Sequence, residues 1–193
     1  MKPQQLLICI FSLFYPLAAF AQQTAADLYN SGEAHRQKRD YDGAIADLTN
    51  AIALHPKYVD AYFSRGYARE KKGDFAGAVS DFSKSIELNP KFAAAYFDRG
   101  TTKLNQRDFN GAIADYSKAI ELHLNYAPLY DHLGLAKASL GDIDGAIAEF
   151  SKAIELNPTY AMAYRDRGNA KKRKGDTKGA EEDYRIASDL HPK

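Results

Sequence analysis

The chain has 193 residues, with 26 Lys and Arg against 25 Asp and Glu, one Cys, no Trp and 45% hydrophobic residues. A formal net charge of +1 provides no basic excess for bulk binding of nucleic acid. One cysteine excludes an intramolecular disulfide and a cysteine-rich zinc site, and the hydrophobic share argues against intrinsic disorder.

The N-terminal segment has the pattern of a secretory signal peptide. A 15-residue apolar run from Leu6 to Phe20 is followed by Ala21, which completes an Ala-x-Ala ending. The run is short for a membrane span, and this ending is typical of a cleavage site. We therefore predict cleavage after Ala21, a short leader at 22–24, a periplasmic or secreted location and no stable membrane insertion after signal removal. An uncleaved membrane anchor is the alternative, whereas Cys9 lies too early in the run for a lipidation site.

A 34-residue repeat organises the rest of the chain. A glycine-alanine pair recurs at Gly43-Ala44, Gly77-Ala78, Gly111-Ala112, Gly145-Ala146 and Gly179-Ala180. A single glycine recurs at Gly32, Gly66, Gly100, Gly134 and Gly168, and a proline at Pro56, Pro90, Pro158 and Pro192, with Leu124 in the vacant position. Three columns with one period define five units at 25–58, 59–92, 93–126, 127–160 and 161–193.

Each unit is predicted to contain two helices. In the second unit, apolar and small residues recur at three- and four-residue steps over 60–72 and 75–88, with Gly73-Asp74 between them. An aspartate precedes every second helix, where its carboxylate can accept hydrogen bonds from free backbone N–H groups; these are Asp40, Asp74, Asp108, Asp142 and Asp176. The third junction lacks the proline and has Pro128 in the first turn of the next helix, so we expect it to bend differently.

The units resemble the tetratricopeptide repeat family. The family's order of aromatic, glycine, alanine, aromatic, alanine and proline occurs in the fourth unit as Tyr130, Gly134, Ala146, Phe150, Ala153 and Pro158. The second unit has Tyr62, Gly66, Ala78, Phe82, Ser85 and Pro90. The resemblance implies an all-α fold, a right-handed superhelical solenoid of five helix-turn-helix repeats with a concave and a convex face. The first unit departs from the pattern, since leucines replace its aromatics and Arg39 replaces the turn glycine.

The last helix is more polar than its equivalents. A column of Ile45, Val79, Ile113 and Ile147 becomes Glu181, and a column of Ile52, Ile86, Ile120 and Ile154 becomes Ser188. Because the end of a solenoid must be soluble, we expect the array to end at the fifth unit.

No motif for catalysis, phosphate binding or metal coordination is present, so we predict no enzyme activity, no catalytic residue, no metal and no cofactor. His55, His123 and His191 share one position at the end of the second helix, where helix capping is favoured over a metal site. His132 lies on a first helix toward the predicted groove, without a second ligand nearby in sequence.

A column of arginines faces a column of acids. Arg65, Arg99 and Arg167 have two possible roles: a ladder that binds acidic ligands, and bridges to the second-helix acids Asp81, Asp115 and Asp183. The bridges are favoured.

The family resemblance also implies a partner-binding groove along the first helices. Its residues here are Tyr29, Phe63, Tyr67, Phe97, Thr101, Asp131, Leu135, Arg165, Asn169 and Arg173. Aromatic residues dominate the first three units and basic residues the fifth, so we hypothesise a partner with an apolar stretch for repeats one to three and an acidic end for repeat five. Packing between repeats is the alternative role of Phe63 and Phe97.

We therefore predict an exported, non-enzymatic adaptor or scaffold that binds a peptide or partner helix in this groove. It is expected to be a monomer that binds no nucleic acid. The alternative is a self-associating structural subunit of an envelope or secretion assembly. Such a subunit would show a mass in solution that rises with protein concentration, whereas a monomeric adaptor would not.

Overall fold

The structure, a computed structural model, describes residues 23–190, which form ten helices and no strand. In chain order they are α1 (Ala25–Gln37), α2 (Tyr41–Leu54), α3 (Val59–Lys71), α4 (Phe75–Leu88), α5 (Ala93–Asn105), α6 (Phe109–Glu121), α7 (Ala127–Ser139), α8 (Ile143–Leu156), α9 (Ala161–Lys174) and α10 (Thr177–Leu190). The predicted signal peptide at 1–21, with Cys9, and the C-terminal His191 and Pro192 lie outside the described residues.

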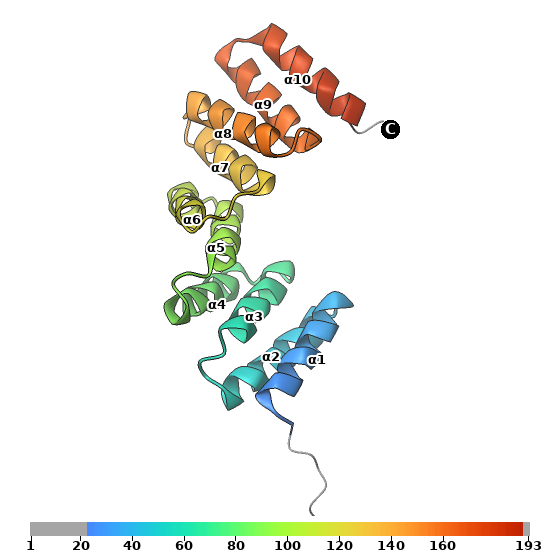
Figure 1. Ribbon diagram of the computed structural model, residues 1–193, viewed down its shortest axis with the longest axis vertical. Helices are drawn as coiled ribbons and strands as arrows, with labels where there is room; N and C mark the ends of the chain where they lie inside the picture. The colour runs from blue at the N-terminus through green and yellow to red at the C-terminus, as the bar shows by residue number, and fades with distance from the viewer. Residues whose placement is uncertain (1–22, 191–193) are drawn as a thin grey trace, which may run out of the picture.

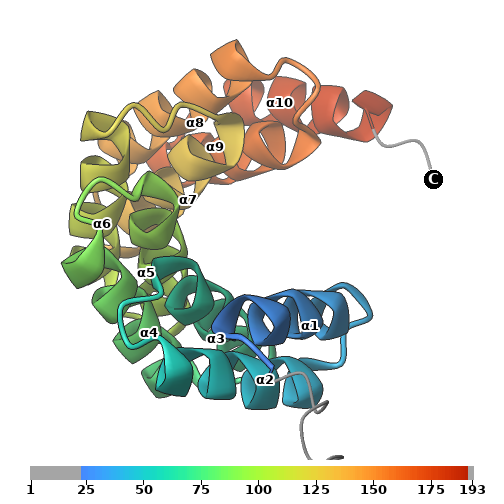
Figure 2. The same cartoon turned by 60° about the horizontal axis from the view of Figure 1, so that its bottom comes forward.

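The helices form five hairpins that stack in chain order into a curved array (Figure 1). Figure 2 shows the first helix of each hairpin toward the inside of the curve and the second helix toward the outside, most clearly for α5 and α6. The all-α solenoid of helix-turn-helix repeats predicted from the sequence is confirmed.

Each second helix begins directly after the aspartate predicted to cap it. A side-chain oxygen of the capping aspartate accepts a hydrogen bond from the backbone N–H three residues later, at distances of 2.9 to 3.1 Å. The donor is in every unit the glycine of the glycine-alanine pair. These caps satisfy N–H groups that the first helical turn leaves free.

The first-helix glycine lets the two helices of a hairpin approach each other. A Cβ atom built at Gly134 would lie 2.7 Å from Cε1 of Phe150, and one at Gly100 would lie 2.8 Å from Cε1 of Tyr116. In the first unit the neighbour is Leu48. The rings of Phe150 and Tyr116 are fully buried, so glycine on one helix and a large side chain on the other form the core of each hairpin.

The arginine column forms the predicted bridges. Arg65, Arg99 and Arg167 each bind the aspartate 16 residues later, with N···O distances of 2.6 to 2.7 Å. Each also donates to a hydroxyl of the preceding unit, on Thr49, Ser83 and Ser151. The arginines therefore join neighbouring hairpins as well as the two helices of one hairpin.

The third junction differs from the others, as predicted. His55, Asn89 and Asn157 end α2, α4 and α8 with extended backbones, at φ between −136° and −142°. In contrast, α6 ends at Glu121, and His123 adopts a left-handed φ of 65°. The missing proline thus changes how the chain leaves the third hairpin.

Candidate functional site

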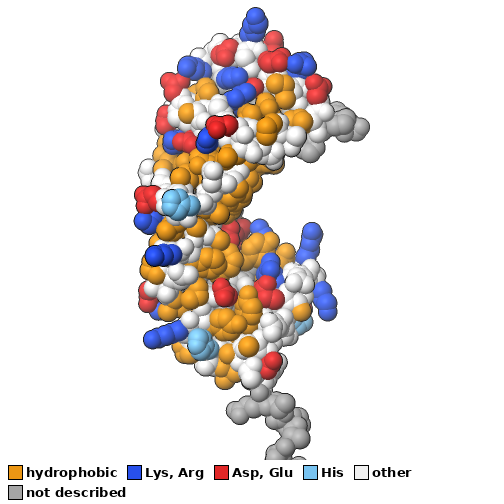
Figure 3. Space-filling view, in the orientation of Figure 1, with side chains coloured by type: hydrophobic (Ala, Val, Ile, Leu, Met, Phe, Trp, Pro, Cys, Tyr) orange, Lys and Arg blue, Asp and Glu red, His pale blue; other side chains and the backbone are white. Residues whose placement is uncertain are grey.

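The inner side of the curve carries the predicted groove. Figure 3 shows the molecule hollowed on one side, with hydrophobic side chains gathered around the hollow. The predicted groove residues separate into three cavities, a packed centre and one buried side chain.

The first cavity lies between the first three units and has a volume of about 350 Å³. Three predicted groove residues line it, namely Tyr29 from α1 and Phe63 and Tyr67 from α3. Phe92, which precedes α5, holds the Phe63 ring at a centroid distance of 4.8 Å. Residues from three hairpins therefore meet in one concave site.

Charged groups share this cavity with the aromatic rings. Glu33 and Arg36 form an ion pair at 2.6 Å, and Asp60 and Asp98 complete the charged part of the wall. Burial works against ionisation of Glu33, but hydrogen bonds from Arg36 and Ser64 lower the pKa of its carboxyl below the ordinary value. Burial, with repulsion from Glu70, raises the pKa of Asp98 to about 7, although Lys71 opposes this.

The second cavity lies between the fourth and fifth units, with a volume of about 160 Å³. Three predicted groove residues from neighbouring repeats line it together: Leu135 from α7, and Asn169 and Arg173 from α9. Arg173 donates a hydrogen bond of 3.0 Å to the carbonyl of Ala138, which fixes its position. Asp166 lies in the same wall and is bound by Arg165 at 3.1 Å.

Phe97 and Thr101 form a packed centre between the two cavities. The ring of Phe97 stacks on His132, with centroids 5.5 Å apart and an interplanar angle of 7°, and it also contacts Tyr126. Thr101 lies 3.3 Å from Nδ1 of His132 and accepts a hydrogen bond from the Tyr116 hydroxyl. Burial lowers the pKa of His132, so this imidazole is a neutral packing group. For Phe97 the structure favours the alternative role of packing between repeats.

Asp131 lies on the predicted face but offers a partner no surface, because its side chain is fully buried. Oδ1 has no hydrogen-bond partner among the described residues, and Oδ2 accepts from the Tyr160 hydroxyl at 3.5 Å. Burial, with the charge of Asp166, raises the pKa of Asp131 to about 7, against opposing effects of Tyr160 and Arg165.

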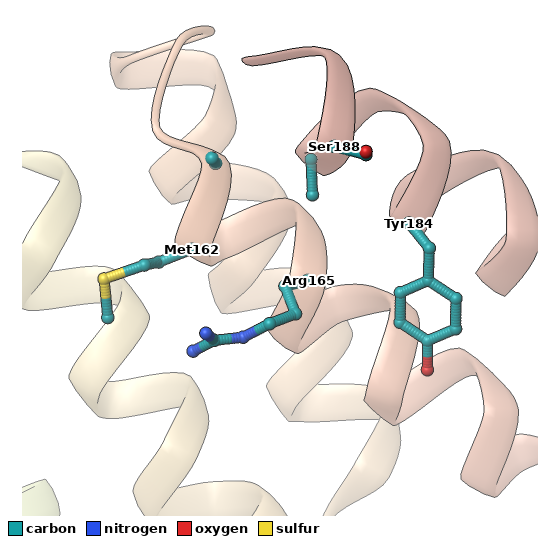
Figure 4. A pocket seen from close by; sticks show the side chains of 6 residues that line it. Met162, Arg165, Tyr184 and Ser188 are labelled. Carbon is teal, nitrogen blue, oxygen red and sulfur yellow. The ribbon is translucent and has the colours of Figure 1, made fainter. Parts of the chain in front are cut away.

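Arg165 lines a third cavity, of about 370 Å³, between α9 and α10. Figure 4 shows Met162 and Arg165 projecting from α9 and Tyr184 and Ser188 from α10 around this space. This cavity belongs to the last described hairpin, and no predicted groove residue other than Arg165 lines it.

Sequence analysis missed several residues that shape these cavities, above all Asp60, Ser64, Phe92 and Asp98. One signal was available, because an aromatic residue ends each of the first four units: Tyr58, Phe92, Tyr126 and Tyr160. Each of these rings contacts a predicted groove residue on the first helix of its own unit. The pairs are Tyr58 with Tyr29, Phe92 with Phe63, Tyr126 with Phe97 and Tyr160 with Asp131.

Within residues 23–190, no group of three or more His, Cys, Asp or Glu side chains is arranged to hold a metal ion. No helix of this part of the chain combines the length and hydrophobicity that crossing a membrane requires. What the cavities do offer is aromatic surface, hydrogen-bonding groups and charge on a concave face, which are the usual means of binding a protein segment.

Comparison with known proteins places the repeats among tetratricopeptide models. One model, described as tetratricopeptide repeat, matches residues 29–91 and 68–123, and another, described as TPR repeat, matches residues 134–175. No curated protein sequence matches the chain.

Several solved structures share the fold. A MamA crystal structure is 28% identical with a TM-score of 0.80, covering 87% of this chain and 92% of that chain. MamA from Desulfovibrio magneticus RS-1 is 22% identical with a TM-score of 0.82, covering 86% and 94%. YrrB, described as a TPR protein with an unusual peptide-binding site, is 22% identical with a TM-score of 0.76, covering 89% of each chain.

Proposed function

Because this chain belongs to the tetratricopeptide repeat family, we propose that it is a protein-interaction module that holds a peptide or helix of a partner protein in its concave groove. One observation carries the proposal: Tyr29, Phe63 and Tyr67, which belong to two hairpins, line a single cavity on the inner face. Members of the family are generally binding modules without enzymatic activity, and the function proposed here is binding alone.

The cavity walls have features that favour binding of a protein segment. Their rings are held in place by packing, as Phe63 is by Phe92, so little side-chain freedom is lost on binding. Tyrosine and arginine are also the side chains that most often dominate binding energy at protein interfaces, and Tyr29, Tyr67 and Arg36 are present.

The test is photocrosslinking in the native cell with a probe at Tyr67. We expect it to capture a protein partner. A matched probe at Ser80, which is exposed on the outer helix α4 of the same hairpin, should not capture it. Equal capture from both positions would reject the groove as the binding surface.

We also propose that the protein is exported, on the basis of its N-terminal sequence pattern. N-terminal sequencing of the protein isolated from its cell envelope or medium should begin at Gln22. An intact Met1 on the purified protein would reject cleavage.

Self-association is a second candidate function, and the third cavity favours it. Met162 there is 43% exposed, beside Ala161 and Ala187, which gives the last described hairpin an exposed apolar surface. Sedimentation of the purified protein over a concentration series separates the candidates, because a mass that stays monomeric throughout would reject self-association.

A further inference from the structure

The first cavity combines aromatic rings with carboxylates. Four of its side chains are aromatic: Tyr29, Phe63, Tyr67 and Phe92. Packing fixes two of the rings, since Tyr29 lies 5.0 Å from Tyr58 and Phe63 lies 4.8 Å from Phe92 between ring centroids. The aromatic part of the wall is therefore preformed.

The same cavity has an excess of negative charge. Three carboxylates, Glu33, Asp60 and Asp98, face one guanidinium, that of Arg36. Arg36 is already paired with Glu33. Asp60 and Asp98 have no side-chain hydrogen bond or ion pair with any of the residues 23–190, so two carboxylates of this wall are without a direct partner.

Asp98 is the more informative of the two. Its carboxyl is half-buried, and burial together with the charge of Glu70 raises its pKa to about 7, with Lys71 acting in the opposite sense. A half-buried carboxylate without a partner is unfavourable, and a cation placed beside it would remove that cost.

The protein itself shows that one ring of this cavity, that of Tyr67, accepts cations. The guanidinium of Arg36 lies 5.2 Å from the centre of the Tyr67 ring, and Nζ of Lys71 lies 4.8 Å from it. Among the described residues, no cation lies over the rings of Tyr29 or Phe63. Because Tyr29 and Phe63 line the cavity, a cation from another molecule can reach these two rings.

Resting on the function proposed above, we propose that this cavity binds the cationic side chain of a lysine or arginine from the partner segment. The aliphatic stem of such a side chain packs on Tyr29 and Phe63, while its ammonium or guanidinium group pairs with Asp60 and Asp98. This replaces the purely apolar contact that the aromatic sequence pattern suggested for repeats one to three.

The preference is local to this end of the groove. The second cavity is lined by one acid, Asp166, and one base, Arg173, and the third is lined by Arg165, which is paired with Asp166. Of these three cavities, the first has an excess of carboxylates, so a basic residue of the partner is directed to the first three repeats.

A direct test compares, by NMR titration of the purified protein, two small probes that share a four-carbon side chain and differ in its terminal ammonium group. N-acetyl-lysine methylamide is expected to shift the amide signals of Glu33, Ser64 and Tyr67. N-acetyl-norleucine methylamide, which lacks the ammonium group, should bind at least about fivefold more weakly. Equal responses to both probes would overturn the inference, and this comparison requires no variant.

Variants then test whether Asp60 and Asp98 are the carboxylates that give this preference. The double variant Asp60→Asn/Asp98→Asn should lose the preference for the lysine probe. The variant Asp144→Asn, which makes the same kind of change at an exposed site on α8, should keep it. A double variant that folds and still prefers lysine would overturn the assignment to these two carboxylates.

Selection from a random peptide phage library separates this inference from the proposed function. Peptides that compete with the lysine probe and are enriched in lysine or arginine would support both. Peptides that bind the groove without a basic residue would reject the inference and leave the proposed function standing. Failure of every peptide and both probes to bind would reject both.

Discussion

Three residues of the described chain adopt a left-handed backbone although they are not glycine: Arg39, Arg107 and His123, at φ of 61° to 65°. Arg39 and Arg107 occupy the turn position at which the other units have Gly73, Gly141 and Gly175. A Cβ atom makes this conformation unfavourable, so two of the five turns carry strain that glycine would not.

We predict that Arg107→Gly raises the free energy of unfolding by about 0.5–1 kcal/mol, because relief of this strain exceeds the added freedom of the unfolded chain. Gln106→Gly is the matched control, since Gln106 has a φ of −81° and glycine there brings only the entropic cost. Urea unfolding followed by circular dichroism measures both. A loss of stability in Arg107→Gly would contradict the strain.

Asp131 gives a second prediction at the residue scale. Its pKa is raised from 3.8 to about 7, so between these pH values the folded protein binds a proton that the unfolded chain releases. Stability conferred by this group therefore falls as pH rises from about 4 to about 7. Asp131→Asn, which carries no charge to bury, should raise the free energy of unfolding at pH 8 by on the order of 2–4 kcal/mol, and by much less at pH 5.

Urea unfolding at the two pH values checks this. Asp144→Asn is the control, because the side chain of Asp144 is 77% exposed and its replacement should not produce the same gain at pH 8. Equal effects of Asp131→Asn at pH 5 and pH 8 would show that the charge of Asp131 is not the cause.

At the scale of the helix pair, close approach depends on glycine. Alanine normally stabilises a helix relative to glycine by about 1 kcal/mol. At Gly134, however, a Cβ atom would lie 2.7 to 3.0 Å from three atoms of the buried Phe150 ring. Overpacking of this kind costs about 1–3 kcal/mol, so the steric effect is expected to exceed the gain in helix propensity.

We predict that Gly134→Ala lowers the free energy of unfolding by about 1–2 kcal/mol. The effect should shrink in a Phe150→Leu background, where the ring is absent. A double-mutant cycle from urea unfolding measures this coupling. Purely additive effects would contradict a direct clash between the two residues.

Much of the hairpin could be predicted from the sequence because its signals are local or strictly periodic. The aspartate caps act over three residues, and the glycine and alanine columns repeat every 34 residues. The inner face was harder to predict. Phe97 and Asp131 lie at groove positions, but they are covered by Tyr126 and Tyr160 of the same units, a contact that depends on how the following hairpin stacks.

The charge of the first cavity was missed for a related reason. Asp60 and Asp98 are 38 residues apart and lie at different positions of the repeat, so no column of the sequence connects them. The curvature of the array brings them to one wall. Periodicity therefore predicted the helices and their pairing, whereas the chemistry of the groove required the three-dimensional arrangement.

At the scale of the whole molecule, a curved stack of hairpins presents a continuous inner face built from one helix of every unit (Figure 2). Each repeat of such an array contacts only its neighbours, so the stability of the array is approximately the sum of the repeats' own stabilities and of the contacts between adjacent repeats. The inner face, in contrast, extends over all of the repeats. A partner segment that lies along this face would contact several units at once.

A photocrosslinking scan against the captured partner tests the central claim most directly. One set of probes replaces Glu33, Tyr67, Thr101, Leu135 and Asn169, one per repeat on the inner helices. The other replaces Ala46, Ser80, Ala114, Ala148 and Glu182, which are exposed on the outer helices. We predict crosslinks from at least two consecutive inner positions, including Tyr67, and none from the outer set. Crosslinks confined to the outer positions would contradict a groove-binding function.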